Sequence, residues 1–377
     1  MQYAVHVPAM RGKMGSRTYY SCLLPLEAIQ SMFKFDPDER QWTDLSPEQR
    51  EQRALNKSRV PVIASYILEN EDDYLFASIT ASYKSEPVFI PSTNDLLDGA
   101  EDIGVLKLKL GDELTINDGQ HRCAAIVEAV KKNPALASQT ISVLLFPWEN
   151  VARVQQMFTD LNRHVVKTSK SLDVLFDKRD PISIATMFSL NKVPVFEGLT
   201  EKVDASLKAK STKIFTLAAL YDANNDLLKD QEPDNVEENA KLLTEYWATV
   251  SDHMADWKKV LNGQKLATEL RAESISAHST VLRALGGLGA ELMKSEDWKE
   301  RLVALGQVDW SKKNADWQNV CIVANSVVSN RQARAATKAY IKGRLGMDLS
   351  EAEQRSIKMP LKTSAAALAA ALESIEL

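Results

Sequence analysis

The segment Asp118-Gly119-Gln120-His121-Arg122 holds the residues best suited to chemistry in this sequence. Gly119 lets the backbone approach a ligand closely, and Asp118 is expected to cap the helix that follows. The first N–H groups of that helix would attract an anion. His121 and Arg122 add a titratable donor and a planar fork of N–H groups, which suit a phosphate. The residues alone leave two alternatives, a phosphate or nucleotide site and a capped helix start with solvated charges.

A second polar cluster begins at Asn162 and Arg163, directly after an expected amphipathic helix over residues 150–161. It is dense in groups that donate hydrogen bonds to phosphate. A nucleotide pocket could therefore close between this cluster and residues 118–122. The alternative is a solvated basic loop.

Two basic segments could contact DNA. Within an expected helix over residues 320–344, four cations spaced 3, 4 and 4 residues apart lie within about 80° on one face. Neutralising about four phosphates predicts a slope of log K against log salt of about −4. The other segment is an expected exposed loop over residues 11–17, and a solvated surface is the alternative for both. The DNA-contact candidates are Arg331, Arg334, Lys338 and Lys342 on the helix and Arg11, Lys13 and Arg17 in the loop.

The elements expected to position these residues divide the chain in two. Up to about residue 200, apolar and β-branched runs predict strands, and a strand, a tight turn and a helix are expected over residues 114–132. After about residue 200, helical patterns dominate, and the glycines at 286, 287 and 289 indicate close helix packing. The expected fold is α+β, with an α/β domain over residues 1–200 and a mainly helical domain over residues 201–377.

Composition excludes several classes of protein. The 377 residues are 45% hydrophobic and 26% charged, which is typical of a folded globular chain rather than a disordered or collagen-like one. Lys and Arg number 46 against 51 Asp and Glu, a net charge of −5, so a nucleic acid would have to bind at local basic patches. Neither a signal peptide nor an apolar run of about 18 residues is found, which indicates a cytoplasmic protein that binds no membrane.

The three cysteines are far apart in sequence and predict neither a zinc site nor a disulfide framework. No metal site is expected. Cys22 follows the basic loop and is a candidate redox residue, since oxidation of a thiol there could regulate DNA binding. An inert buried cysteine is the alternative.

The segment INDGQHRCAAI resembles the DGQHR motif of the DndB family of DNA sulfur-modification proteins. Residues 55–83, 155–181 and 211–221 agree with that family, so the resemblance covers roughly residues 1–230. The family is distantly similar to the ParB/sulfiredoxin-like fold, in which a strand, turn and helix with a G-x-x-R motif holds nucleotide phosphates. Gly119, His121 and Arg122 match that motif. Gln120 stands where sulfiredoxin-like enzymes carry their reactive cysteine, so thiol chemistry is not expected.

The resemblance also implies roles for residues outside the motif. A polar helix in ParB-like proteins contributes to nucleotide binding, which implies that role for Asn162 and Arg163. Asn56 and Arg59 resemble the basic element that precedes the first long helix of the family and could face the same pocket; an exposed helix start is the alternative.

The resemblance implies a DNA-binding repressor of a DNA phosphorothioate-modification gene cluster, gated by a nucleotide at the DGQHR motif. Its expected partners are double-stranded DNA from its own promoter, ATP or another nucleoside triphosphate with Mg²⁺, and a second copy in a homodimer. The enzyme alternative is a ParB-like nucleoside triphosphate hydrolase in which Asp118 is the candidate catalytic residue that holds Mg²⁺. A third alternative is a structural adaptor that binds neither DNA nor nucleotide.

Overall fold

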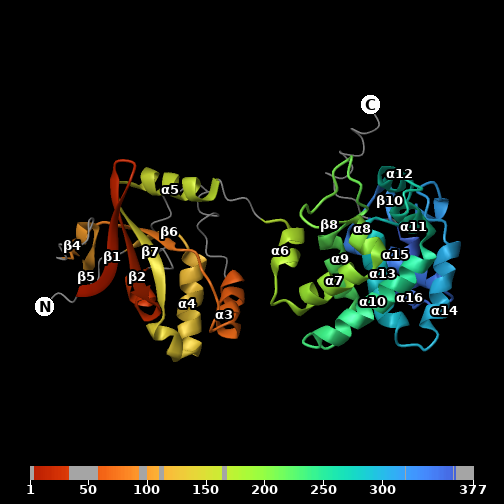
Figure 1. Ribbon diagram of the computed structural model, residues 1–377, viewed down its shortest axis with the longest axis horizontal. Helices are drawn as coiled ribbons and strands as arrows, with labels where there is room; N and C mark the ends of the chain where they lie inside the picture. Colours follow the sequence, from red (N-terminus) through yellow and green to blue (C-terminus); the bar gives the residue numbers. More distant parts are fainter. Residues whose placement is uncertain are drawn as a thin grey trace. The chain divides into compact units, whose positions relative to one another are not determined.

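The computed structural model describes residues 4–33, 58–92, 100–109, 114–163, 168–318, 320–359 and 361. The chain forms two compact units, Met1–Val166 and Lys167–Leu377, and each has its own hydrophobic core (Figure 1). The first unit is built on a seven-stranded mixed sheet, and the second is mainly helical. The predicted α+β class is therefore confirmed.

The sheet has the strand order β4-β5-β1-β2-β7-β3-β6, and every neighbouring pair is antiparallel except β3 and β7. Burial alternates along β2, β5 and most of β7, which is expected where one face of a sheet is more buried than the other, whereas β3 is buried throughout. The strands are β1 (Ala4–Met14), β2 (Arg17–Pro25), β3 (Ile79–Tyr83), β4 (Val88–Pro91), β5 (Ile103–Lys109), β6 (Thr115–Asp118) and β7 (Thr140–Pro147).

The basic segment at residues 11–17 is the end of the β1–β2 hairpin, and the expectation of an exposed loop is wrong. Met14 pairs with Arg17, and Gly15 has a φ of +63° at the first central position of the two-residue turn. Val7 and Ala9 on β1 are buried, as are Cys22 and Leu24 on β2. This period-two burial lies at the base of the hairpin, and the backbone pairing continues through the basic residues to Met14 and Arg17. The three cations in the sequence did not indicate these strands.

One face of the sheet is covered by α3 (Arg59–Glu69) and α4 (Gln120–Lys132), which lie side by side (Figure 1). Ile67 of α3 and Ile126 of α4 are fully buried with Val143 of the sheet. The short elements η1 (Leu26–Ala28), α1 (Ile29–Met32) and η4 (Pro134–Ser138) complete this layer, while η3 (Ala100–Asp102) precedes β5. The helix α5 (Val151–Arg163) lies against β6.

The second unit consists of helices joined by short loops and two small two-stranded sheets. The expected helix over residues 320–344 begins only at Arg331, because a small hairpin precedes it. The helices are α6 (Lys170–Phe176), α7 (Pro181–Lys192), α8 (Pro194–Leu199), α9 (Leu217–Leu227), α10 (Val236–His253), α11 (Ala255–Leu261), α12 (Ala267–Glu273), α13 (Ser279–Leu292), α14 (Trp298–Leu302), α15 (Arg331–Arg344) and α16 (Glu351–Lys358), with η5 (Val303–Gln307) and η6 (Ala315–Trp317). The short strands are β8 (Thr200–Glu201), β9 (Phe215–Thr216), β10 (Ile322–Val323) and β11 (Ser326–Val327).

The glycines of α13 permit close packing, as the sequence predicts. A Cβ atom on Gly286 would lie 2.1 Å from the carbonyl oxygen of Ala223 on α9. A Cβ atom on Gly289 would lie 2.7 Å from the ring of Tyr246. A Cβ atom on Gly287 would lie 3.7 Å from Cδ of Lys338, which is an ordinary van der Waals distance. Two of the three glycines are therefore required by the packing.

The helices α6 to α8 pack with the second unit, whereas the sequence-based division at residue 200 placed them with the first. Val174 of α6 and Phe196 of α8 are buried in the helical core. The apolar faces of α7 and α8 meet α9, α10 and α11, which come later in the chain. In the described part of the chain, no helix is both long enough and apolar enough to span a lipid bilayer.

Candidate functional site

The DGQHR segment forms the predicted strand, turn and helix. Strand β6 ends at Asp118, Gly119 follows with a φ of +104°, and α4 begins at Gln120. A side chain at residue 119 would be strained by this φ, and its Cβ atom would lie 3.2 Å from Nη2 of Arg122. Glycine is therefore the residue that this turn requires.

Arg122 is held by the protein itself. Its Nη2 donates to Oδ2 of Asp118 at 2.5 Å, and its Nη1 donates to the carbonyl oxygens of Ala77 and Ser78, the latter at 3.2 Å. Only 17% of the Arg122 side chain is exposed. The guanidinium thus joins α4 to the end of β6 and to the chain entering β3. Two expectations change: Arg122 is not a free phosphate fork, and Asp118 pairs with it instead of capping α4, whose N-cap is Gly119.

Arg59 and His121 are brought together because α3 and α4 lie side by side. Burial lowers the pKa of His121, the positive charge of Arg59 lowers it further, and Asp118 opposes both. His121 is half-buried, and Arg59 is exposed at the first turn of α3. The structure therefore places an exposed cation beside the N-terminus of α4, and the role of Arg59 in a nucleotide pocket stays a prediction.

The remaining candidates for this pocket are described only in part. Gln120 is half-buried at the start of α4. The residues Asn162 and Arg163 end α5, and their side chains lie outside the described part of the structure. Asn56 also lies outside the described residues. Their roles in a nucleotide pocket stay predictions.

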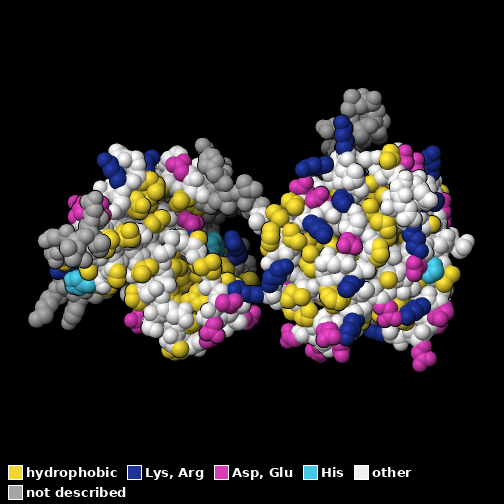
Figure 2. Space-filling model, viewed as in Figure 1, with side chains coloured by type: hydrophobic (Ala, Val, Ile, Leu, Met, Phe, Trp, Pro, Cys, Tyr) yellow, Lys and Arg dark blue, Asp and Glu magenta, His cyan; other side chains and the backbone are white. Residues whose placement is uncertain are grey.

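The four-cation face expected on α15 is largely neutralised within the protein. Lys338 pairs with Glu291 of α13, and Lys342 lies 2.9 Å from Glu291 and 3.0 Å from Glu353 of α16. These lysines dock α15 against its neighbouring helices and are not available to DNA. Figure 2 shows basic and acidic side chains interspersed over the helical unit, on the face that it presents.

Arg331 and Arg334 on the same helix have no ion-pair partner among the residues that the structure describes. They are two charges where the spacing predicts four. The expected face is therefore half as charged as the sequence indicates, and a slope of about −4 from this helix alone is not expected.

The β1–β2 hairpin also carries cations. Arg11 pairs with Asp102 at 2.8 Å and lies over the ring of Phe89. Lys13 is exposed, and within the described ranges it has no acidic partner. Arg17 lies over the ring of Phe146 and carries a buried Nη1 that has no hydrogen-bond acceptor among the described residues. The end of the hairpin therefore carries an exposed Lys13 and a half-buried Arg17, neither of which has an acidic partner among the described residues.

Cys22 has none of the properties of a reactive thiol. Its side chain is 2% exposed, and its Sγ lies 3.6 Å from the carbonyl oxygen of Val143. Burial raises the pKa of the Cys22 thiol to about 12, so the reactive thiolate is disfavoured. These observations oppose the redox role and favour the inert alternative.

The comparison with protein families covers both units. Residues 7–348 match the family DndB, described as DNA-sulfur modification-associated. The chain belongs to the DndB family. This confirms the resemblance carried by the DGQHR segment and extends it through α15. No curated protein and no solved structure matches the chain.

One feature of this DndB-family site was missed from the sequence. Asp118 and Arg122 are four residues apart, but Asp118 belongs to β6 and α4 begins only at Gln120, so the rule that residues four apart meet on a helix does not predict their ion pair. The pair depends on the left-handed turn at Gly119, which brings the end of β6 beside the first turn of α4.

Proposed function

We propose that this DndB-family protein is a DNA-binding regulator that represses the genes of a DNA sulfur-modification system. The match over residues 7–348 carries the proposal, because it links both units of the chain to DNA sulfur modification. The β1–β2 hairpin is the proposed contact with DNA. A two-stranded ribbon fits the major groove, and Lys13 and Arg17 supply charge for phosphates at its end.

The charge distribution limits how this contact works. With a net charge of −5, the protein relies on few phosphate contacts. Two hairpin cations per chain correspond to a slope of log K against log salt of about −2, and a homodimer would double it to about −4. The salt slope thus reports how many hairpins engage one duplex.

A nucleotide at the DGQHR segment is the proposed effector of this regulator. Its phosphates would lie between the first N–H groups of α4 and the guanidinium of Arg59. Arg122 would act as a positioning residue that fixes the turn. Because the Asp118 carboxylate is paired with Arg122, Mg²⁺ binding and hydrolysis at Asp118 would compete with that pair. We therefore propose nucleotide binding rather than turnover.

DNA binding is tested by fluorescence anisotropy with a duplex from upstream of the protein's own gene cluster and with a scrambled duplex, over a salt series. The upstream duplex should bind more tightly. The double variant K13A/R17A should weaken binding about tenfold or more and reduce the magnitude of the salt slope by about 2 for each hairpin that engages the duplex. The matched control is K131A/K132A, which removes the same charge from the end of α4.

Equal affinity for both duplexes would overturn the repressor proposal. Selective binding that K13A/R17A leaves unchanged would move the interface away from the hairpin, with Arg331 and Arg334 as the next residues to substitute.

Nucleotide gating is tested by repeating the titration with Mg-ATP. The affinity for the upstream duplex should change with Mg-ATP, and Arg59→Ala should abolish that change without altering binding in its absence. Arg355→Ala in the second unit is the control. Phosphate release measured in the same samples separates the alternatives: steady release of phosphate would favour the hydrolase over the gated regulator.

A further inference from the structure

One face of the sheet in the first unit is exposed and apolar over β4, β5, β1 and β2, on the side opposite α3 and α4 (Figure 1). Ile90 is paired with Val105 and Ile103 with Met10, so these side chains project from neighbouring strands on the same side. We call this surface the open face. Its exposed apolar side chains, each between 37% and 58% exposed, include Met10, Leu23, Val88, Ile90, Ile103 and Val105.

The open face is large and flat enough to bind another protein surface. Four strands about 4.8 Å apart and about 20 Å of strand length give its apolar part a projected area of about 400 Å². An exposed apolar patch of this size on a soluble protein commonly marks an interaction site. With its polar margin, the face approaches the roughly 800 Å² that each subunit of a stable dimer buries.

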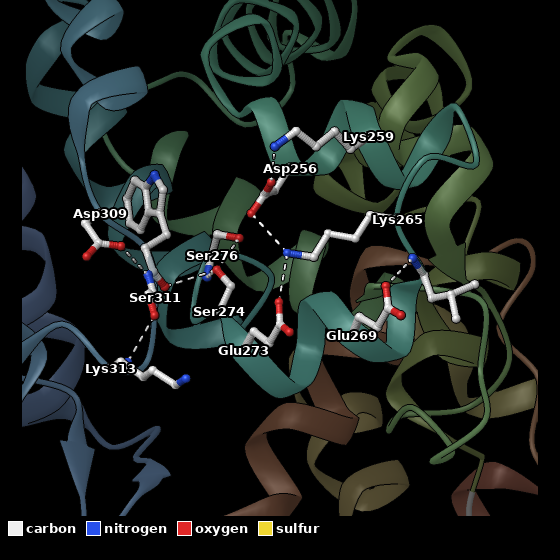
Figure 3. Close-up of polar contacts among 12 residues, drawn as sticks. Asp256, Lys259, Lys265, Glu269, Glu273, Ser274, Ser276, Asp309, Ser311 and Lys313 are labelled. Carbon is white, nitrogen blue, oxygen red and sulfur yellow. Dashed lines mark hydrogen bonds and ion pairs between the residues drawn. The ribbon is translucent and has the colours of Figure 1, made fainter.

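Many charged side chains of the helical unit are already paired with one another. Lys265 lies 3.4 Å from Asp256 and 3.2 Å from Glu273, and Lys259 lies 3.0 Å from Asp256 (Figure 3). Charges that neutralise one another within a unit give little preference for an outside partner. The two ends of the open face differ in this respect.

Unpaired charges of opposite sign lie at the ends of the open face. Lys107 and Lys109 follow Val105 on the same side of β5, and Glu101 lies in η3, directly before this strand. All three charged residues are exposed, and none has an ion-pair partner among the residues that the structure describes. The strands β4, β5, β1 and β2 contain no acidic residue. The open face therefore complements a copy of itself that is turned end over end, because the basic end of one meets the acidic end of the other.

We propose that the open face is the contact between two copies of this chain. A two-fold axis that crosses the strands at Val105 would place each β5 antiparallel over the β5 of the other copy, with the two sheets about 10 Å apart. Val105 would then meet its counterpart, and Lys109 of each copy would lie near Glu101 of the other. Ile90, which pairs with Val105, would lie along the same axis, so the centre of the contact is apolar. This inference does not depend on the binding of DNA or nucleotide.

The β4 edge of the sheet is the alternative contact between copies, since an edge strand can pair with another chain. Pro91 ends β4 and has no N–H to donate, which weakens strand pairing there. Substitution of Val105 distinguishes the two contacts, because β5 is an inner strand that is already paired on both sides.

Sedimentation equilibrium of the full chain tests the proposal. The mass at micromolar concentration should be twice the 42.0 kDa of one chain. Val105→Glu should weaken dimerisation at least tenfold, since it places two like charges at the axis. Val62→Glu, at an exposed valine of α3 in the same unit, is the matched control and should leave dimerisation unchanged.

Charge reversal tests the orientation of the two copies. Lys109→Glu and Glu101→Lys should each weaken dimerisation at least threefold. The double variant should restore dimerisation, because the pair between the copies forms again with its signs exchanged. A loss of folding in either single variant would not be restored in this way.

A cysteine at the axis gives an independent test. The native cysteines are buried, so oxidation of Val105→Cys should join two chains through the new thiol, whereas Val62→Cys should stay a single chain. The proposal is overturned if the full chain is monomeric at micromolar concentration, if Val105→Glu dimerises as well as the unsubstituted chain, or if the double charge variant is not restored. It is also overturned if Val105→Cys joins no faster than Val62→Cys.

Discussion

At the scale of the residue, Arg122 stabilises the DGQHR turn by connecting α4 to the end of β6 and to the chain that enters β3. Its guanidinium serves Asp118 and two backbone carbonyls, so Arg122→Ala would leave a partly buried carboxylate and two acceptors without their donor. We expect the free energy of unfolding to fall by about 2 kcal/mol, measured by urea denaturation monitored by circular dichroism.

Arg59→Ala is the control for that prediction, because Arg59 is exposed and should leave stability within about 0.5 kcal/mol of the unsubstituted chain. An unchanged free energy in Arg122→Ala would show that the network contributes nothing, and Arg122 would again be available as a phosphate ligand. Because Arg122→Ala is expected to disturb the turn, loss of nucleotide binding in this variant alone does not identify a direct contact between Arg122 and the nucleotide.

The chemistry of individual residues could be predicted from the sequence more easily than their partners. The DGQHR motif was placed correctly because its strand, glycine and helix are local. Lys338 was assigned to a DNA-binding face because the acid that neutralises it, Glu291, is 47 residues away. Long-range pairing depends on how helices pack, which local spacing does not contain.

At the scale of the element, the packing of α13 against α9 depends on one glycine more than on its neighbour. Gly286→Ala would place a methyl group 2.1 Å from a backbone oxygen, so the helices must separate. We expect thermal unfolding to show a loss of about 3 kcal/mol or more. Gly287→Ala meets no close atom and should be neutral or stabilise by up to about 1 kcal/mol. Equal effects of the two substitutions would contradict this packing.

The N-terminus of α13 should make the free energy of unfolding depend on pH. His278 is the N-cap, and its Nδ1 accepts from the N–H of Thr280 at 3.3 Å. Burial, with a smaller effect of Lys312, lowers the pKa of His278 to about 4. Above pH 6.5 the imidazole is neutral in both states. As the pH falls from about 6.5 to about 4, the imidazole of His278 is protonated in the unfolded chain but not in the folded one. The free energy of unfolding therefore falls by on the order of 3 kcal/mol.

Urea denaturation at a series of pH values checks this expectation, with His278→Asn as the comparison. Asparagine caps a helix well and does not titrate. The difference in unfolding free energy between the two proteins should grow as the pH falls through this window and then stay constant. A difference that does not depend on pH would show that His278 is not held neutral by burial.

Elements were predictable from the sequence where one periodicity dominated. The strand over residues 141–146 and the helix over residues 121–132 were placed within a residue or two, because apolar spacing there is uninterrupted. The hairpin over residues 4–25 was missed in part, because three cations within seven residues suggested a loop although burial alternates on both strands.

At the scale of the whole molecule, the boundary between the units decides which fragments fold. The helical core needs α6 to α8: Phe196 is 1% exposed, and its ring contacts those of Phe215 and Trp247.

A fragment of residues 167–377 should therefore unfold cooperatively in urea. A fragment of residues 201–377, cut where composition changes, would expose the surfaces that α7 and α8 cover and should aggregate or unfold without cooperativity. The same cooperative transition in both fragments would place the boundary near residue 200 and leave α6 to α8 outside the helical core. The matching test on the first unit is residues 1–166, which should unfold cooperatively because the core between the sheet, α3 and α4 lies within it.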